Sequence, residues 1–286
     1  MGAMRRRNLG LSFLFLLLSA ACVSQLDNTS QPGPAAPVIA ILGAKSLELE
    51  SLGQSLTDKN ELTIQGVRFT TGSLQDKRVV LAQTGAGKVN AARAATLLVE
   101  RFEPTHVLFT GIAGSVNPDL SPGDIVIGDK TAHHDYGVWT PEGFRASPTV
   151  DPQTGEPNVS FFPADADLLG VAETVAAHLK LAPVTTGQGS RTPRVVTGVI
   201  VTGDAFVSSP AKREALREEF NADTTEMEGA AVAQICRQAR VPCLIVRSVS
   251  DDAGSEARDK ERFFEKTAAQ NAALLVTGVV GRLEAK

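Results

Sequence analysis

The chain has 286 residues, a formal net charge of −4 and 43% hydrophobic residues. This length is sufficient for one α/β domain with a large core. The acidic balance, without a stripe of Lys and Arg, excludes a surface that neutralises nucleic-acid phosphates. Aromatic residues make up only 5% of the chain, so a base-stacking platform for single strands is excluded as well.

The first 22 residues have the pattern of an export signal. A positive start at 5–7 is followed by an apolar run at 9–18, and small residues at 19–21 precede Cys22. Small residues before a cysteine are typical of the bacterial lipoprotein cleavage site, which predicts a lipidated Cys22. Ordinary signal cleavage after Ala21 is the alternative.

Residues 23–37 predict a flexible tether of small and turn-forming residues. Residues 38–286 then predict a single domain. We therefore expect an exported protein, either periplasmic or held at a membrane only by a lipid on Cys22.

Short apolar runs alternate with helical patterns through this domain. The predicted strands are 37–42, 67–74, 77–84, 105–109, 123–128, 195–201 and 244–249, and the predicted helices include 89–102, 165–181, 212–220 and 261–283. Such alternation predicts an α/β fold with helices on both faces of a sheet. Ligands of open α/β sheets bind at the carboxyl ends of the strands.

Two glycine-bearing segments follow predicted strands. Thr84–Lys88 opens a helix but lacks the spacing of a phosphate loop, so it predicts only a close backbone approach to a ligand. Thr110–Gly114 predicts a second such loop, with Ala113 and Gly114 near the ligand.

Acidic residues stand where predicted strands end or helices begin. Glu48 lies in the first turn of a helix, Glu226 and Glu228 lie at a helix entry, and Asp251 ends a buried strand. Their convergence would suit acid–base chemistry on a neutral or cationic substrate. Position alone leaves open that Glu48 is a solvated helix charge. Phe206 likewise either packs in the core or stacks on a flat ligand.

Seven motifs in order resemble those of the 5′-methylthioadenosine/S-adenosylhomocysteine nucleosidases, within the nucleoside phosphorylase superfamily. They are GA…E at 43–48, TGAGKV at 84–89, TGIAG at 110–114, PGDIVIGD at 122–129, TGDAF at 202–206, EMEGAA at 226–231 and VRSVSD at 246–251. The resemblance implies a three-layer α/β/α sandwich around a twisted mixed sheet, in a homodimer. It also implies a cofactor-free hydrolysis that uses water to release adenine from a nucleoside.

The resemblance implies roles for individual residues. Asp251 is similar to the general acid that protonates N7 of adenine, and Glu48 to the base that activates water. Glu228 is similar to the residue that accepts hydrogen bonds from the ribose 2′ and 3′ hydroxyls. The other implied contacts are Met227 on ribose, Phe206 and the Val207 backbone on adenine, Ser250 beside Asp251, and Glu226 with Arg247 as supports.

Two residues depart from the family pattern. Lys45 replaces a common Met, and Ile112 replaces a common small residue. Lys45 is either a solvated charge or a positive group beside the sugar that would suit a bound phosphate or an acidic 5′ substituent. The segment 138–144, expected to line the 5′ pocket, matches poorly as well.

Other readings remain open. A phosphorylase would use phosphate in place of water, and an exported binding lipoprotein would not turn its ligand over. Cys236 and Cys243 are expected to be buried reduced thiols. No Cys/His pattern indicates a metal site.

Overall fold

The computed structural model describes residues 37–186 and 189–284. The predicted export signal, Cys22 and the tether up to residue 36 lie outside this part of the chain. Within it, no helix is both long and apolar enough to cross a membrane.

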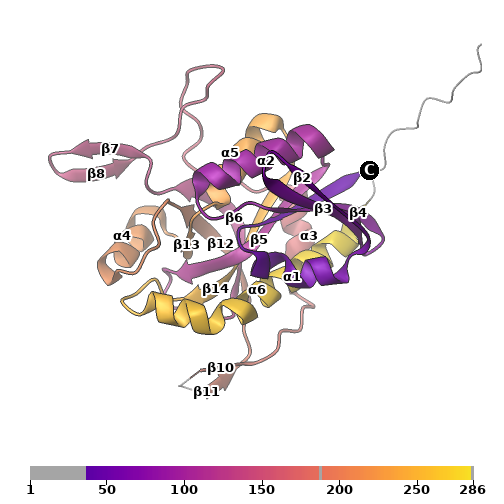
Figure 1. Ribbon diagram of the computed structural model, residues 1–286. Coiled ribbons are helices and arrows are strands. Elements are labelled where there is room, and N and C mark those ends of the chain that lie inside the picture. The colour runs from indigo at the N-terminus through magenta and orange to yellow at the C-terminus, as the bar shows by residue number, and fades with distance from the viewer. Residues whose placement is uncertain (1–36, 187–188, 285–286) are drawn as a thin grey trace, which may run out of the picture. The chain divides into compact units, whose positions relative to one another are not determined.

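A mixed sheet of ten strands forms the centre of the fold (Figure 1). Its order is β13 (Thr224–Glu226), β12 (Val195–Thr202), β6 (Ile125–His133), β14 (Cys243–Asp251), β5 (His106–Ser115), β1 (Val38–Gly43), β4 (Lys77–Gln83), β3 (Val67–Leu74) and β2 (Thr57–Ile64), with β9 (Phe162–Pro163) paired to β6. β1 is parallel to β4 and β5, whereas β14 is antiparallel to β6.

The short strand β13 has two partners. It pairs in parallel with β12 and in antiparallel with β5. Because β12, β6, β14 and β5 are already joined side by side, β13 closes these five strands into a ring. β1, β4, β3 and β2 extend the sheet from β5, and β9 pairs with β6.

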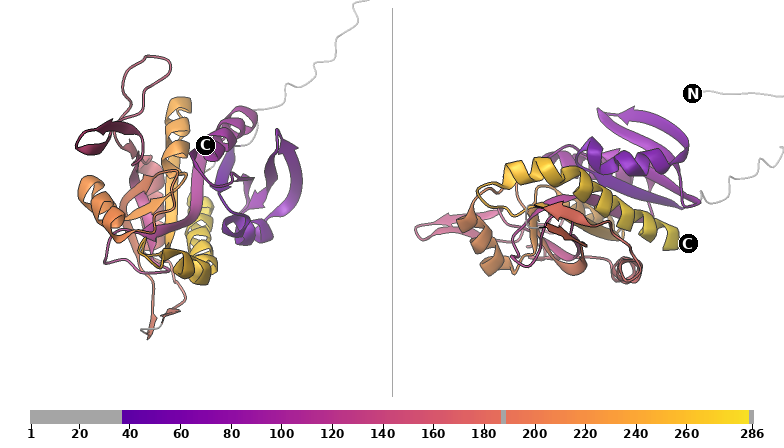
Figure 2. Two further views of the ribbon diagram at one scale, coloured as in Figure 1. Left: turned by 60° about the vertical axis from the view of Figure 1, so that its left-hand side comes forward. Right: turned by 90° about the horizontal axis from the view of Figure 1, so that it is seen from below.

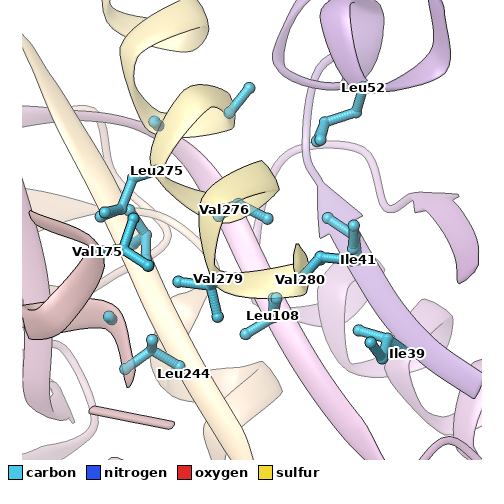
Figure 3. Packing of buried hydrophobic residues seen from close by; sticks show 14 of the residues in the cluster. Ile39, Ile41, Leu52, Leu108, Val175, Leu244, Leu275, Val276, Val279 and Val280 are labelled. Atoms are coloured by element: carbon cyan, nitrogen blue, oxygen red, sulfur yellow. The ribbon is translucent and has the colours of Figure 1, made fainter. Parts of the chain in front are cut away.

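Helices cover both faces of the sheet, because the apolar side chains of β1 alternate between the two faces and both sets need a core to pack in. Ile39 and Ile41 point into one core with α1 (Ser46–Ser55), α3 (Ala166–Ala176) and α6 (Ala257–Arg282), shown in Figure 3. Ala40 and Leu42 point into the opposite core with α2 (Lys88–Phe102) and α5 (Gly229–Ala239). Successive strand residues face opposite sides, so the predicted three-layer α/β/α fold is confirmed.

The predicted helix starts are largely confirmed. The side chain of Ser209 caps α4 (Pro210–Phe220) by accepting from the backbone of Lys212, and Pro210 occupies the first turn. Asp165 caps α3 in the same way. α3 ends at Ala176, before the predicted Leu181, and α6 begins at Ala257, before the predicted Glu261.

The prediction of a loop at Thr110–Gly114 is wrong. These residues continue β5, with Thr110 and Gly111 paired to Val246 and Arg247 of β14 and Gly114 paired to Thr225 of β13. The glycines here permit side chains to approach the strand closely, and they do not make a turn.

The long irregular stretch predicted after His133 contains a protruding hairpin. Its strands are β7 (Gly137–Thr140) and β8 (Gly143–Ala146), which pair only with each other (Figures 1 and 2). A second small hairpin joins β10 (Val184–Thr186) and β11 (Gly189–Arg191). Edge strand β2 was not predicted because it is polar and mostly exposed.

Candidate active site

A cavity of about 80 Å³ lies where the carboxyl ends of β13 and β14 meet the N-termini of α1 and α5. Nine of the predicted site residues line it: Glu48, Ala113, Gly114, Phe206, Glu226, Met227, Glu228, Ser250 and Asp251. Ala44, Lys45, Ala86, Ile112, Thr225 and Glu261 complete the lining. Residues more than 200 positions apart in the chain therefore share one site.

Glu48 is buried and held by the backbone around it. Its Oε2 accepts from the N–H groups of Ala44 at 2.6 Å and Lys45 at 2.8 Å, and its Oε1 accepts from Ile112 at 3.0 Å. A Cβ at Gly111 would lie 2.9 Å from Oε1 of Glu48, so only glycine leaves room for this carboxyl group. The alternative of a solvated helix charge is thus wrong.

Arg247 lies beneath the acidic side of the cavity and does not line it. Its Nη2 lies 2.7 Å from Glu226 and 3.9 Å from Glu228, and its guanidinium covers the ring of Phe109. Arg247 is only 1% exposed. One buried cation therefore faces three buried carboxyl groups, those of Glu48, Glu226 and Glu228.

Burial, together with the excess of carboxyl groups over cations, shifts the pKa values of Glu48 and Glu228. Burial raises the pKa of Glu48, although Arg247 and the three backbone donors oppose the rise. Burial also raises the pKa of Glu228, and repulsion by Glu226 adds to the effect. Both side chains are thereby able to exchange protons closer to neutral pH than an exposed glutamate would.

Glu226 and Glu228 both face the site because the backbone between them is not yet helical. Glu226 ends β13, and Glu228 is the N-cap of α5 with φ −139°. Glu226 accepts from the backbone N–H groups of Glu228 and Gly229 and from Arg247. Glu228 accepts from Gly87 at 2.8 Å, which fixes it beside the predicted glycine loop.

Asp251 lies across the cavity and is 2% exposed. Its Oδ1 accepts from the N–H of Ala253 at 2.9 Å, and the Ser250 hydroxyl lies 2.8 Å from its Oδ2. Burial raises the pKa of Asp251 to about 6 despite both contacts. A Cβ at Gly114 would lie 2.7 Å from Oδ1, so this glycine also makes room for an acid.

Ser250 can support a protonated Asp251. Its hydroxyl oxygen also lies 3.3 Å from the carbonyl oxygen of Ala113. A hydroxyl donates one proton but retains lone pairs. Ser250 can therefore donate to Ala113 and accept from the neutral Asp251 carboxyl group.

Three residues expected to contact the substrate differ in their setting. Met227 and Phe206 line the cavity, and the guanidinium of Arg258 lies 4.4 Å from the centre of the Phe206 ring. A flat ligand would use the ring face that Arg258 leaves open. The side chain of Val207 packs in a separate core with Val199 and Val201 and does not line the cavity.

The departures from the family pattern also have clear positions. Lys45 is neither a freely solvated charge nor a free cation, because it pairs with Glu261 and Glu265 of α6. Ile112 contributes its backbone N–H to Glu48. The segment 138–144 does not line the cavity of its own chain, which corrects that expectation.

One supporting residue was missed. Thr202 ends β12, donates to Glu226 and accepts from the N–H of Ala230 at 2.8 Å. It lies inside the TGDAF motif, so the motif was the available signal. Cys236 and Cys243 are free thiols; Cys236 is buried as expected, whereas Cys243 is partly exposed. Within residues 37–186 and 189–284, no group of three His, Cys, Asp or Glu side chains is placed to hold a metal ion.

The burial of Asp251 should make the stability of Asp251→Asn depend on pH. The pKa of Asp251 is about 6 in the folded protein, above its ordinary value of 3.8. The stability that the protonated carboxyl group contributes is therefore complete below the ordinary pKa and is lost as the pH rises through the folded pKa. We expect the variant to be more stable than the wild type by about 3 kcal/mol at pH 8 and by about half of that at pH 5. Urea denaturation at both pH values measures this difference, and an equal gain at both would contradict it.

A mixed sheet between two helical layers, with buried acids around a cavity at the strand ends, defines an α/β protein of the nucleoside phosphorylase and hydrolase type. The family model described as "Phosphorylase superfamily" matches residues 38–281. The chain belongs to this superfamily and, within it, to the family of the 5′-methylthioadenosine/S-adenosylhomocysteine nucleosidases.

Individual relatives agree with this assignment. The nucleosidase of that name from Geobacillus sp. (strain WCH70) is 38% identical over 247 residues, which cover 86% of this chain and 99% of the relative. The corresponding crystal structure from Neisseria meningitidis, in complex with methylthio-immucillin-A, has 35% identity and a TM-score of 0.75, and covers 86% of this chain and 99% of that one. Futalosine hydrolase of Helicobacter pylori is also similar, with 30% identity, a TM-score of 0.74, and coverage of 87% of this chain and 99% of that one.

Proposed function

We propose that this protein hydrolyses the N-glycosidic bond of adenosine-type nucleosides, such as 5′-methylthioadenosine and S-adenosylhomocysteine, and releases adenine. The observation that carries the proposal is the placement of buried Glu48 and Asp251 on one cavity with Glu228. An acid and a base around one bound molecule are what glycosidic hydrolysis requires. The activity named for the relatives supports the same reaction.

In this reaction Asp251 donates a proton to N7 of adenine, so that the base leaves as a neutral molecule. The ribose then develops oxocarbenium character. Glu228 accepts hydrogen bonds from the 2′ and 3′ hydroxyls, and its position against Gly87 and Arg247 keeps it directed at the sugar. Glu48 accepts a proton from the attacking water, and its raised pKa makes it a stronger base than an exposed glutamate.

Other residues position these groups. Phe206 stacks on adenine, the Val207 backbone binds its Watson–Crick edge, and Met227 lies against ribose. Ala113 and Gly114 form the cavity wall beside Asp251. Glu226, Arg247 and Ser250 hold the catalytic carboxyl groups in place.

The charge of the cavity supports water over phosphate as the nucleophile. All the lining residues lie within the part of the chain that the structure describes. Lys45 is the one cation among them, and it is already paired with Glu261. A phosphate anion would instead meet Glu48, Glu226 and Glu228. None of the lining residues therefore offers an unpaired positive charge to bind this anion.

We expect adenine release to proceed at the same rate with and without inorganic phosphate. The assay follows free adenine and 5-methylthioribose from 5′-methylthioadenosine in phosphate-free buffer and again after phosphate is added. A strict requirement for phosphate, with 5-methylthioribose 1-phosphate as product, would identify a phosphorylase. Nucleoside binding by calorimetry without adenine release would identify a binding protein.

The protruding hairpin supports a homodimer. Val138 and Trp139 of β7 are 59% and 79% exposed, and Tyr136, just before this strand, is also exposed. Large apolar side chains exposed on a projecting segment are typical of an interaction surface. Replacing Val138 and Trp139 by Ser should convert a dimer to a monomer in light scattering, and a wild type that is itself monomeric would overturn the proposal.

Export and anchoring are proposed from the sequence pattern of residues 1–22. The protein would then be periplasmic or held at the membrane by a lipid on Cys22 and would act on scavenged nucleosides. Cys22→Ser should release it from the membrane fraction of cells expressing the full chain. A wild type found only in the cytoplasm would contradict the proposal.

A further inference from the structure

One wall of the cavity is made by an ion pair between α1 and α6. The Nζ of Lys45 lies 2.5 Å from Glu261 and 3.4 Å from Glu265, and both Lys45 and Glu261 line the cavity. The side chain of Glu261 is only 14% exposed. The Lys45 side chain is 42% exposed, so the pair is partly desolvated, mainly on the side of Glu261.

The part of the substrate that faces this wall follows from the proposed function, on which the inference rests. The proposed function assigns the adenine base to Asp251, the ribose hydroxyls to Glu228 and the attacking water to Glu48. The lining residues to which no part of the substrate has been assigned are Ala44, Lys45, Ala86, Ile112, Thr225 and Glu261. The substituent on C5′ is the part of the nucleoside left to meet them.

The chemistry of the wall then differs from that of an apolar pocket. Ala86 and Ile112 are apolar, but the ion pair offers an ammonium donor and a carboxylate acceptor in the same lining. Covering these groups with an alkylthio substituent would remove water from them and return no hydrogen bond. One cation against two carboxylates also leaves the cluster with a net negative charge.

We propose that the Lys45–Glu261 pair determines the specificity of the site, and that it favours nucleosides with a neutral or cationic polar 5′ group over those with an alkylthio or a carboxylate group. A 5′ hydroxyl or amine hydrogen-bonds to Glu261. A 5′ carboxylate is repelled by Glu261 and Glu265, because Lys45 is already neutralised. The acidic 5′ group that an unpaired Lys45 would have suited is thereby excluded.

The test compares adenine release from four nucleosides: adenosine, 5′-amino-5′-deoxyadenosine, 5′-methylthioadenosine and adenosine 5′-carboxylate. In the double variant Lys45→Met/Glu261→Gln, the ratio of kcat/KM for adenosine to that for 5′-methylthioadenosine should fall by about tenfold, as expected for loss of a hydrogen bond to a charged group. Glu261→Gln alone should raise kcat/KM for the 5′-carboxylate relative to the wild type, because one repelling charge is gone.

A matched control lies one residue away on the same helix. Lys260 pairs with Asp252 at 2.6 Å, and neither residue lines the cavity. Lys260→Met/Asp252→Asn should leave the relative kcat/KM values of the four nucleosides unchanged. Adenine release by the wild type with ratios that do not move in the Lys45/Glu261 variants would overturn this inference alone. Absence of adenine release from every nucleoside would overturn the proposed function.

Discussion

Replacing Asp251 by Asn should reduce kcat by ~10²–10⁴-fold, the usual contribution of a general acid. An amide has nearly the same shape as the carboxyl group and can still accept the N–H of Ala253, now made at 2.9 Å. It has no proton to transfer to N7, so adenine would have to leave as an anion. The measurement is single-turnover adenine release, which separates the chemical step from product release.

Asp252→Asn is the control for this variant. Asp252 is adjacent in sequence, but it pairs with Lys260 outside the cavity, so its loss should leave kcat within about twofold, as usual for a surface pair. The two variants should have the same circular dichroism spectrum. Wild-type rates in Asp251→Asn would remove this residue from the mechanism.

Replacing Glu48 by Gln should also reduce kcat by ~10²–10⁴-fold. Gln cannot accept the proton of the attacking water, and it creates a second problem. Both oxygens of Glu48 accept backbone N–H groups, from Ala44, Lys45 and Ile112. The amide nitrogen of Gln must face one of these donors, so we also expect about 1–3 kcal/mol lower stability.

Activity and stability must be measured together for this variant. Glu50→Gln on the same helix changes an exposed residue and should leave both unchanged. The activity of Glu48→Gln is compared with the wild type at a temperature at which denaturation curves show both to be folded. If the rate loss disappears under those conditions, Glu48 has a structural role and is not the base.

The acids of the site could be predicted from sequence because each stands beside an element boundary. Asp251 ends a β-branched strand and Glu48 enters a helix, and both boundaries have local signals. The extended backbone between Glu226 and Glu228 could be predicted too. Side chains two residues apart diverge on a helix, so both glutamates can face one site only if this backbone is not helical.

The rest of the site depends on distant contacts that leave no local signal. Lys45 and Glu261 are 216 residues apart, and nothing near Glu261 distinguishes it from other helical charges. The VRSVSD motif indicates Arg247 as a support, but its place between Glu226 and Glu228 follows from the packing of β14 beneath them. For the same reason Thr110–Gly114 was predicted as a loop, since glycines required for close approach resemble glycines required for a turn.

The ring closed by β13 has a consequence for the durability of the enzyme. The strand that ends in Glu226 is hydrogen-bonded to a neighbour on each side, and the strand that ends in Asp251 belongs to the same closed circuit. Neither acid sits on a segment that can fray by itself. Glu226 and Asp251 should therefore keep their positions until the ring as a whole unfolds.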